Sequence, residues 1–141
     1  MQLTRAGEYG ILGILYLAAH YEEPVVMLAQ IAEAEGIPES FLRKIFSFLA
    51  KQGLVEAHRG RSGGFRLARP PAEISLREVI EAIEGRIALN VCLMGPRACD
   101  RMDRCPVHDI WREAQGALLR ELERHSLADI VARGAAAHRR G

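Results

Sequence analysis

The residues with the strongest potential for chemistry are three cysteines that occur close together in the second half of the chain. Six residues separate Cys92 from Cys99, five separate Cys99 from Cys105, and His108 follows after two more. Thiolates are ligands for zinc and for iron–sulfur clusters, and neutral imidazole is a common metal ligand. The residue types and their spacing predict a metal or cluster site, and they leave both zinc and iron open.

Other interpretations of the same cysteines are a structural zinc site, redox-active thiols without a metal, and buried core thiols. A Cys3His zinc site has suitable ligands, but the usual short Cys-x-x-Cys hooks are absent. Core thiols are disfavoured because the segment is rich in Gly, Pro and polar residues. An odd number of cysteines also counts against a disulfide framework.

The elements that must position these residues follow from the hydrophobic periodicity, which changes from helical to strand-like and back. We expect helices over 3–20, 27–35, 38–51, 75–84, 106–124 and 126–132, with strands at 54–57 and 64–67. The predicted fold is mainly α with a small β-hairpin wing: a winged helix-turn-helix domain plus a long C-terminal dimerisation helix. The predicted boundaries are 1–71 for the DNA-binding domain, 72–132 for the helix, cluster-binding loop (86–105) and dimerisation helix, and 133–141 for a flexible tail.

Basic residues are concentrated in the predicted winged helix rather than spread along the chain. The whole chain carries a formal charge of +1, whereas residues 36–69 alone sum to +5. The helix over 38–51 offers Ser40, Arg43 and Lys44 on its polar face, and an α-helix of this kind fits the major groove of DNA. The hairpin tip carries Arg59 and Arg61 beside small residues that include Gly63 and Gly64, so its backbone can approach phosphates or enter a minor groove. This order of elements predicts double-stranded DNA as a partner.

Several function classes are excluded by what the sequence lacks. The opening residues do not form a signal peptide, and no apolar stretch is long enough to span a bilayer. We therefore expect a cytoplasmic protein with reduced thiols and no membrane partner. An enzyme is not expected, because Glu8, His58 and His108 are too scattered for acid–base pairing and no nucleophile motif is present.

Four segments together resemble the bacterial family of iron–sulfur cluster regulators and nitric-oxide-sensing repressors. They are MQLTRAGEYG at the start, ESFLRKIFSFLAKQGLVEAHRGRSGGFRLAR in the middle, ISLREVIEAIEG after it, and the cysteine loop ending in CPVHDIW. The resemblance covers nearly the whole chain. It implies a winged-helix homodimer, a repressor in type, whose affinity for DNA depends on the state of its cluster.

The resemblance also implies a ligand set. Cys92, Cys99 and Cys105 would be the cysteine ligands, and His108 matches the fourth ligand of the branch that carries [2Fe–2S], which we favour. Nitric-oxide-sensing relatives, often with [4Fe–4S], use an acidic residue of the first helix, so Glu8 of the partner subunit is the alternative. The gap between Cys92 and Cys99 is one residue longer than is common in the family. Members that regulate cysteine metabolism lack these cysteines. A zinc-stabilised or thiol-redox regulator without a cluster remains the alternative function.

Residues for DNA and for the partner subunit follow in the same way. Ser40, Phe41 and Arg43 align with the positions of the recognition helix that face DNA, and Arg59 and Arg61 align with the wing. A glutamate often stands in the family at position 43, where Arg favours guanine and Glu would favour cytosine. The long helix would pair two subunits on a palindromic site, with recognition helices about 34–36 Å apart. The expected seam consists of Val107, Ile110, Trp111, Ala114 and Leu118.

Overall fold

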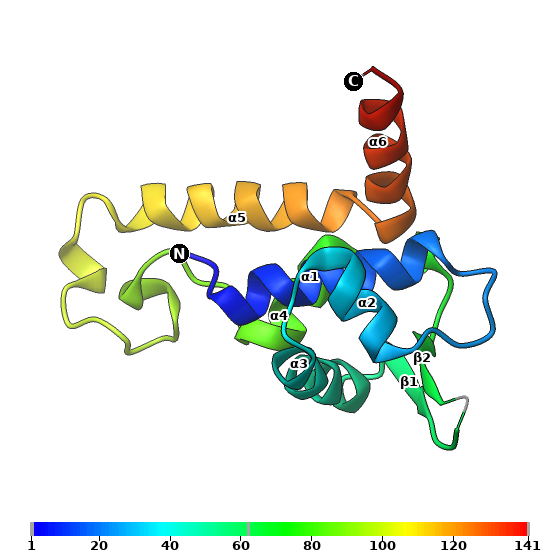
Figure 1. Ribbon diagram of the computed structural model, residues 1–141. Helices are drawn as coiled ribbons and strands as arrows, with labels where there is room; N and C mark the ends of the chain where they lie inside the picture. The colour runs from blue at the N-terminus through cyan, green and yellow to red at the C-terminus, as the bar shows by residue number, and fades with distance from the viewer. Residues whose placement is uncertain (1, 62, 141) are drawn as a thin grey trace.

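The computed structural model describes the backbone of residues 2–61 and 63–140, and side chains as far as residue 136 (Figure 1). Its first three helices are α1 (Arg5–Ala19), α2 (Leu28–Glu35) and α3 (Glu39–Lys51). Thr4 caps α1 by accepting a hydrogen bond from the Gly7 N–H at 3.2 Å, as short polar residues at this position do. Gly36 ends α2 with a φ of 66°, a left-handed conformation that glycine adopts at little cost. The chain can therefore turn sharply from α2 into α3.

The wing is an antiparallel hairpin of β1 (Val55–His58) and β2 (Gly64–Leu67), with Val55 opposite Leu67. Val26, just before α2, adds a third short backbone pairing to it. The Val26 N–H donates to Phe65 O at 2.9 Å, and the Phe65 N–H donates to Val26 O at 2.8 Å. These two bonds fasten the base of the wing to the start of α2, while the hairpin tip points away from the body (Figure 1).

A short 3-10 turn, η1 (Pro71–Glu73), leads into α4 (Leu76–Glu84). The predicted capping box is present, because Ser75 Oγ accepts from the Glu78 N–H and the Glu78 carboxylate accepts from the Ser75 N–H, each at 3.1 Å. After α4 the chain is irregular except for two 3-10 turns, η2 (Val91–Leu93) and η3 (Met102–Arg104). All three cysteines lie in this stretch.

Two helices complete the chain, the long α5 (His108–Arg124) and α6 (Leu127–Arg140). In Figure 1, α5 runs alongside the body and α6 turns sharply away from it. The corner between them is attached to the start of α4 on both sides. The Leu76 N–H donates to His125 O and the Leu127 N–H donates to Ile74 O, each at 2.9 Å.

The hydrophobic core is built by the inner faces of α1, α3 and α4, with contributions from α2, the wing and Leu127. Its fully buried side chains include Ile14, Leu42 and Phe46. Gly10 lets α1 approach its neighbours, since a Cβ there would overlap Ile83 and lie 3.0 Å from Ile45 Cγ2. Because Val79 of α4 is fully buried in the same core, α4 belongs physically to the winged-helix body.

The predicted fold class is confirmed: six helices and a two-stranded antiparallel hairpin form a winged-helix architecture in the described part of the chain. Most ends of helices and strands lie within one or two residues of those expected. Helix α5 begins at His108 instead of near residue 106. The last helix does not end at residue 132 but continues to Arg140, so 133–140 is helical instead of a frayed tail. Alanine is the strongest helix former, and the alanines after Gly134 explain the extension; Gly141 lies outside the described residues.

Candidate DNA-binding surface and cysteine loop

Helix α3 separates its residues into two faces, as a helix with 3.6 residues per turn and three- or four-residue apolar spacing does. Leu42, Ile45, Phe46 and Leu49 are buried against the other helices. The predicted DNA-contacting residues Ser40, Arg43 and Lys44 are all exposed. The structure therefore presents these three side chains on one outward face, where a DNA groove can reach them.

Phe41 differs from its neighbours on this face because part of its side chain packs against α1. Its ring meets Tyr9 of α1 edge-on, with 5.5 Å between centroids, and 40% of its surface stays exposed. Arg43 is also engaged, since its Nη2 donates to Glu39 Oε1 at 2.8 Å. The i, i+4 spacing of Glu39 and Arg43 is the feature of the sequence that is compatible with this contact.

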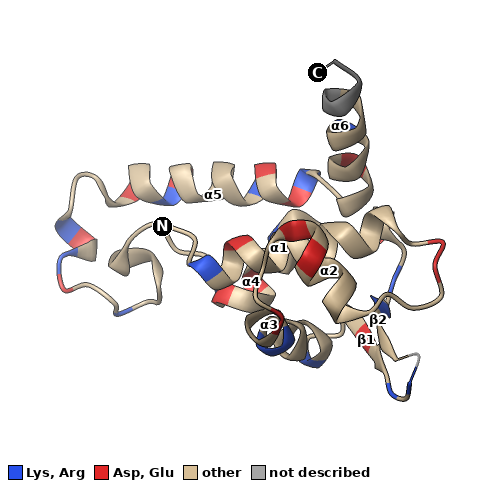
Figure 2. Cartoon of the chain, viewed as in Figure 1, with Lys and Arg blue, Asp and Glu red and all other residues tan. Residues whose placement is uncertain are grey.

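The wing tip carries Arg59 and Arg61, both exposed. Figure 2 shows the Lys and Arg positions of α3 and of the wing tip, in blue, on the side of the molecule away from α5. Gly63 and Gly64 have a packing reason to be glycine: an added Cβ would overlap His58 O at the first and Val26 O at the second. Their predicted contact with DNA stays a prediction.

The cysteine loop carries its thiols at separate places. Cys92 lies in η2, Cys105 follows η3, and Cys99 lies between; all three are free and half-buried. Within the residues that the structure describes, no three His, Cys, Asp or Glu side chains come close enough to hold a metal ion. The predicted ligand set is therefore present in one loop but not gathered around one point.

His108 has a buried ring nitrogen that lacks a hydrogen-bond partner in the described structure. It is the first residue of α5, and the nitrogen is Nδ1. A buried polar nitrogen without a partner costs free energy, so such groups are uncommon and call for an explanation. An unpartnered imidazole nitrogen at the end of the cysteine loop fits the donor chemistry of an iron–sulfur cluster or of zinc.

The start of the loop is attached to α5. The Leu89 N–H donates to Gln115 Oε1 at 2.9 Å, and η2 packs on the same helix. The indole Nε1 of Trp111 lies 3.2 Å from the Asn90 side-chain amide, which accepts from it when the amide oxygen faces the ring. A change in the loop would therefore reach α5 directly.

Glu8, the alternative ligand, is exposed on α1 and is not part of a described cluster with the cysteines. The start of α1 nevertheless lies beside the start of the loop. Gln2 and Leu3 share a cavity of about 180 Å³ with Arg86 to Ala88. Glu84, the last residue of α4, accepts hydrogen bonds from the Thr4 N–H at 3.1 Å and from the Thr4 hydroxyl. This long-range attachment had no signal in the local sequence.

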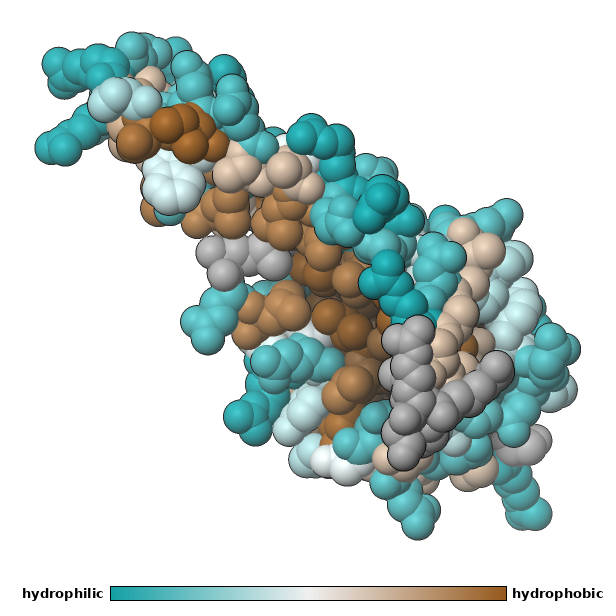
Figure 3. Space-filling model, turned by 90° about the horizontal axis from the view of Figure 1, so that it is seen from above, coloured by the Kyte–Doolittle hydropathy of each residue, from teal (hydrophilic) through white to brown (hydrophobic). Residues whose placement is uncertain are grey.

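Helix α5 leaves an apolar face uncovered. Val107, Ile110 and Trp111 are 44%, 59% and 41% exposed, Ala114 is exposed and Leu118 is half-buried. Elsewhere on the molecule, α1 and α6 border an apolar groove of about 780 Å³. Its lining includes Leu12, Leu15, Tyr16, Ala19, Ile130 and Val131. Figure 3 shows apolar surface running along the middle of this side of the molecule.

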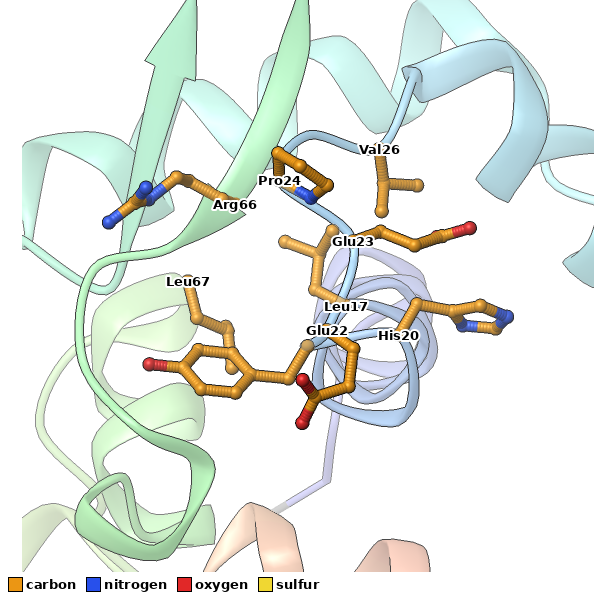
Figure 4. Close-up of a pocket in the computed structure, with 9 residues that line it drawn as sticks. Leu17, His20, Glu22, Glu23, Pro24, Val26, Arg66 and Leu67 are labelled. Atoms are coloured by element: carbon orange, nitrogen blue, oxygen red, sulfur yellow. The ribbon is translucent and has the colours of Figure 1, made fainter.

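Another cavity, of about 220 Å³, lies where the end of α1 meets β2 (Figure 4). Glu22, Glu23 and Arg66 are at its edge. His20 is held by Tyr16, whose ring stacks on it at 4.0 Å and whose carbonyl lies 2.9 Å from His20 Nδ1. We interpret His20 as a packing residue of the turn after α1.

The chain is similar to known transcriptional regulators over most of its length. The family model "Rrf2: Iron-dependent Transcriptional regulator" matches residues 3–133. The HTH-type transcriptional regulator IscR of Serratia proteamaculans is 37% identical over 131 residues, which are 93% of this chain and 79% of that protein. IscR of Aliivibrio salmonicida is 37% identical over the same share of this chain and 77% of its own. No helix within residues 2–61 and 63–140 has the length and apolar composition needed to cross a membrane.

Solved structures agree with the sequence relatives. IscR of T. potens superposes with a TM-score of 0.78 at 28% identity, covering 97% of this chain and 90% of that one. CymR, the global cysteine regulator of B. subtilis, also gives 0.78 at 25% identity, covering 94% and 98%. These proteins are named as regulators, and their similarity confirms the resemblance drawn from the sequence motifs. The chain belongs to the Rrf2 family of iron-dependent transcriptional regulators.

Proposed function

We propose that this regulator is a homodimeric repressor that binds palindromic double-stranded DNA and whose affinity for DNA depends on an iron–sulfur cluster. The observation that carries the proposal is the position of the ligand candidates. Cys92, Cys99 and Cys105 lie in the one connection between α4 and α5, and the unpartnered nitrogen of His108 lies at the first residue of α5, where that connection ends. That connection joins the DNA-reading body to the helix proposed to join the subunits.

The proposed ligands are the three cysteines and His108, with Glu8 of the partner subunit as the alternative to His108. We favour [2Fe–2S] over [4Fe–4S]. When bound, the cluster would supply a centre sensitive to oxidation, nitric oxide or iron supply. The residues of the chain would hold it by drawing together thiols that are apart in this structure.

Contacts between α4 and α5 support a path from the loop to the DNA-binding surface. Arg77 of α4 pairs with Glu81 on its own helix and with Glu123 of α5, the latter at 3.0 Å. Glu84 at the other end of α4 fastens the start of α1. Rearrangement of the loop would shift α5 against α4, and α4 packs directly on α1 and α3. A coupling of ordinary strength changes DNA affinity about 5- to 150-fold.

The cluster is tested by purifying the protein without oxygen. We expect coloured protein that contains iron and sulfide, while colourless protein with stoichiometric zinc would contradict the proposal. His108→Ala and Glu8→Ala should have unequal effects on the visible spectrum, and the one that abolishes the parent spectrum identifies the fourth ligand. Each single Cys→Ser variant should lose the spectrum while the far-ultraviolet circular dichroism of the body is retained.

DNA binding by the wing is tested with Arg59→Ala and Arg61→Ala. Each should weaken binding on all sequences alike and reduce the slope of log affinity against log salt by about one. Arg112→Ala is a suitable control, because Arg112 is an exposed arginine on α5, paired with Asp109. If the two wing variants bind as the control does, the wing does not contact DNA.

A second candidate is a regulator that uses zinc or bare thiols without a cluster. The similarity to CymR, a global cysteine regulator, favours this candidate. A protein free of iron whose DNA affinity changes on reversible thiol oxidation would support this candidate over the first.

A further inference from the structure

The ion pair between Glu39 and Arg43 stands on the face of α3 proposed to enter DNA. Arg43 Nη2 donates to Glu39 Oε1 at 2.8 Å, and the two side chains are 67% (Arg43) and 45% (Glu39) exposed. An exposed i, i+4 pair contributes only about 0.3–0.5 kcal/mol to stability. The small contribution of the pair to stability therefore does not explain why a carboxylate stands at position 39.

A carboxylate on a surface that meets phosphates is unfavourable unless it is neutralised. Residues 36–69 contain only two acidic residues, Glu39 and Glu56. Both are paired with an arginine, Glu56 with Arg66 at 3.3 Å. The two pairs differ in place, because the first stands on the recognition helix and the second crosses between the strands of the wing.

The Glu39 contact leaves most of the guanidinium free. An arginine has five N–H donors in a fixed plane, and the bond to Oε1 uses one of them. A guanine base offers two acceptors in the major groove, O6 and N7, which an arginine can bind together. The held guanidinium therefore keeps enough donors for a bidentate contact while its direction is restricted.

The position of the Glu39–Arg43 pair on α3 suits contact with a base. Glu39 is the first residue of α3, and Arg43 lies one turn further along. The N-terminal residues of a recognition helix are the ones that reach base edges. Without Glu39, the long Arg43 side chain could turn to a phosphate, a contact that carries no sequence information.

We propose that Glu39 and Arg43 act as one unit in sequence recognition, in which Arg43 reads a guanine in the major groove and Glu39 positions its guanidinium. This inference rests on the proposed function, because it requires α3 to enter DNA. It assigns Glu39 as a positioning residue that sets specificity at the expense of affinity. Removing Glu39 should therefore raise binding to unrelated DNA while lowering discrimination at one base pair.

The test uses the full-length protein, purified without oxygen, and a random-sequence duplex library from which the wild type selects its preferred site. Affinity is then measured on that duplex and on each single base-pair variant. The wild type should prefer guanine at one position of each half-site by roughly 5- to 150-fold. Arg43→Ala should lose this preference. Glu39→Ala should reduce it by about 2- to 10-fold, the effect of one hydrogen bond, and should bind unrelated duplexes more tightly, while Glu39→Gln, which keeps an acceptor, should be intermediate.

Glu56→Ala is the matched control, since it also removes a carboxylate from an exposed Glu–Arg pair in the same basic region. It should raise overall affinity without changing preference at any base pair. The inference is overturned if Glu39→Ala has the same base preferences as the wild type, or if Arg43→Ala keeps the guanine preference. A wild type that selects no sequence at all would contradict the proposed function itself, a result distinct from an unchanged profile in the variants.

Discussion

The winged-helix body and the arm differ in how many of their residues are buried. The arm is defined as residues 88–126, which contain the cysteine loop and α5. The body has fully buried side chains on α1, α2, α3 and α4. In the arm, all of which the structure describes, no residue is buried, and Ile87 and Leu127 are the buried residues on either side of it. Burial of apolar surface is the main stabilising contribution in folding. The body can thus hold itself together, whereas the arm lacks the burial that would fix its conformation.

This difference explains why the arm suits a sensor. Segments with few buried apolar contacts open and rearrange at low cost in free energy. Within the arm, the start of the loop is attached to α5 through Leu89 and Gln115, and the end of the arm is attached to α4 of the body at His125. The cysteines lie between Leu89 and His125 in the chain. A ligand that gathers the thiols would therefore change the arm without having to unfold the body.

The largest expected effect is a test of the body's own core. Phe46→Ala should lower the free energy of unfolding by about 3–5 kcal/mol, because it removes a fully buried aromatic ring. Phe48→Ala, on the same helix but 53% exposed, should change it by less than about 0.5 kcal/mol. Denaturant unfolding measures both, and equal effects would mean that the body is not packed as described.

The close approach of α1 to α3 and α4 gives the next effect. Gly10→Ala should destabilise the protein by about 1–3 kcal/mol, since the new methyl group overlaps Ile83. Gly134→Ala in α6, where an added Cβ meets nothing within 4 Å, should stabilise the protein by about 0.5–1 kcal/mol. Thermal melts of the two variants should shift in opposite directions, and a shared direction would argue against the tight helix crossing.

A substitution in the arm should change the stability of the fold less than these core substitutions, but it should clearly weaken dimer assembly. Ile110→Asp places a charge on the uncovered face of α5 and should weaken a dimer by about 1–2 kcal/mol or more. The body should keep its unfolding midpoint at protein concentrations where the wild type is monomeric. Sedimentation velocity measures the assembly, with Arg112→Gln on another side of α5 as the control. An unchanged sedimentation profile for Ile110→Asp would remove this face from the proposed interface.

The smallest effect concerns pH at the corner between α5 and α6. A hydrogen bond with His125, and then one from Arg124, lowers the pKa of Glu121, and hydrogen bonds from the backbone and side chain of Ser126 lower the pKa of Asp129. Carboxyl groups whose folded pKa is depressed stabilise the folded state above their ordinary pKa of about 4, and this contribution is lost as the pH falls through the depressed values.

Both carboxyl groups are exposed, so the loss on acidification should be slight. The double variant Glu121→Gln/Asp129→Asn should show a flatter dependence of unfolding free energy on pH below about 4.5 than the wild type. Denaturant titrations at several pH values measure this slope. Identical slopes would show that the corner does not contribute to acid sensitivity.

Much of the body was predictable because its signals are local. The capping box at Ser75 and Glu78, the glycine turn at Gly36 and the apolar period of α3 each depend on residues a few positions apart. The expected start of α5 and end of α6 were wrong because the local signals at these two positions are weak. Single-residue propensities place helix ends only approximately, and the alanine-rich end of α6 carries a weak hydrophobic pattern.

The candidate site was predictable as a set of residues but not as an arrangement. The cysteine spacing and His108 identify the donors, and the basic residues identify the DNA-facing elements. No local pattern indicated that Val26 fastens the wing or that Glu84 holds the start of α1, because each contact joins residues far apart in the sequence. The i, i+4 spacing of Glu39 and Arg43 permits their contact, but whether it forms depends on which rotamers the helix allows.

By itself, the sequence determined the order of the elements, the family resemblance and the donor residues of the loop, since each depends on residue type and short spacing. Only the tertiary structure decided which of these elements share a core. It joined α4 to the winged-helix body, left the arm without a buried residue, and isolated Nδ1 of His108 from any described hydrogen-bond partner. The physical reason is that burial is a property of the whole fold, so residues of similar hydrophobicity, such as Leu127 and Ile110, end in opposite environments.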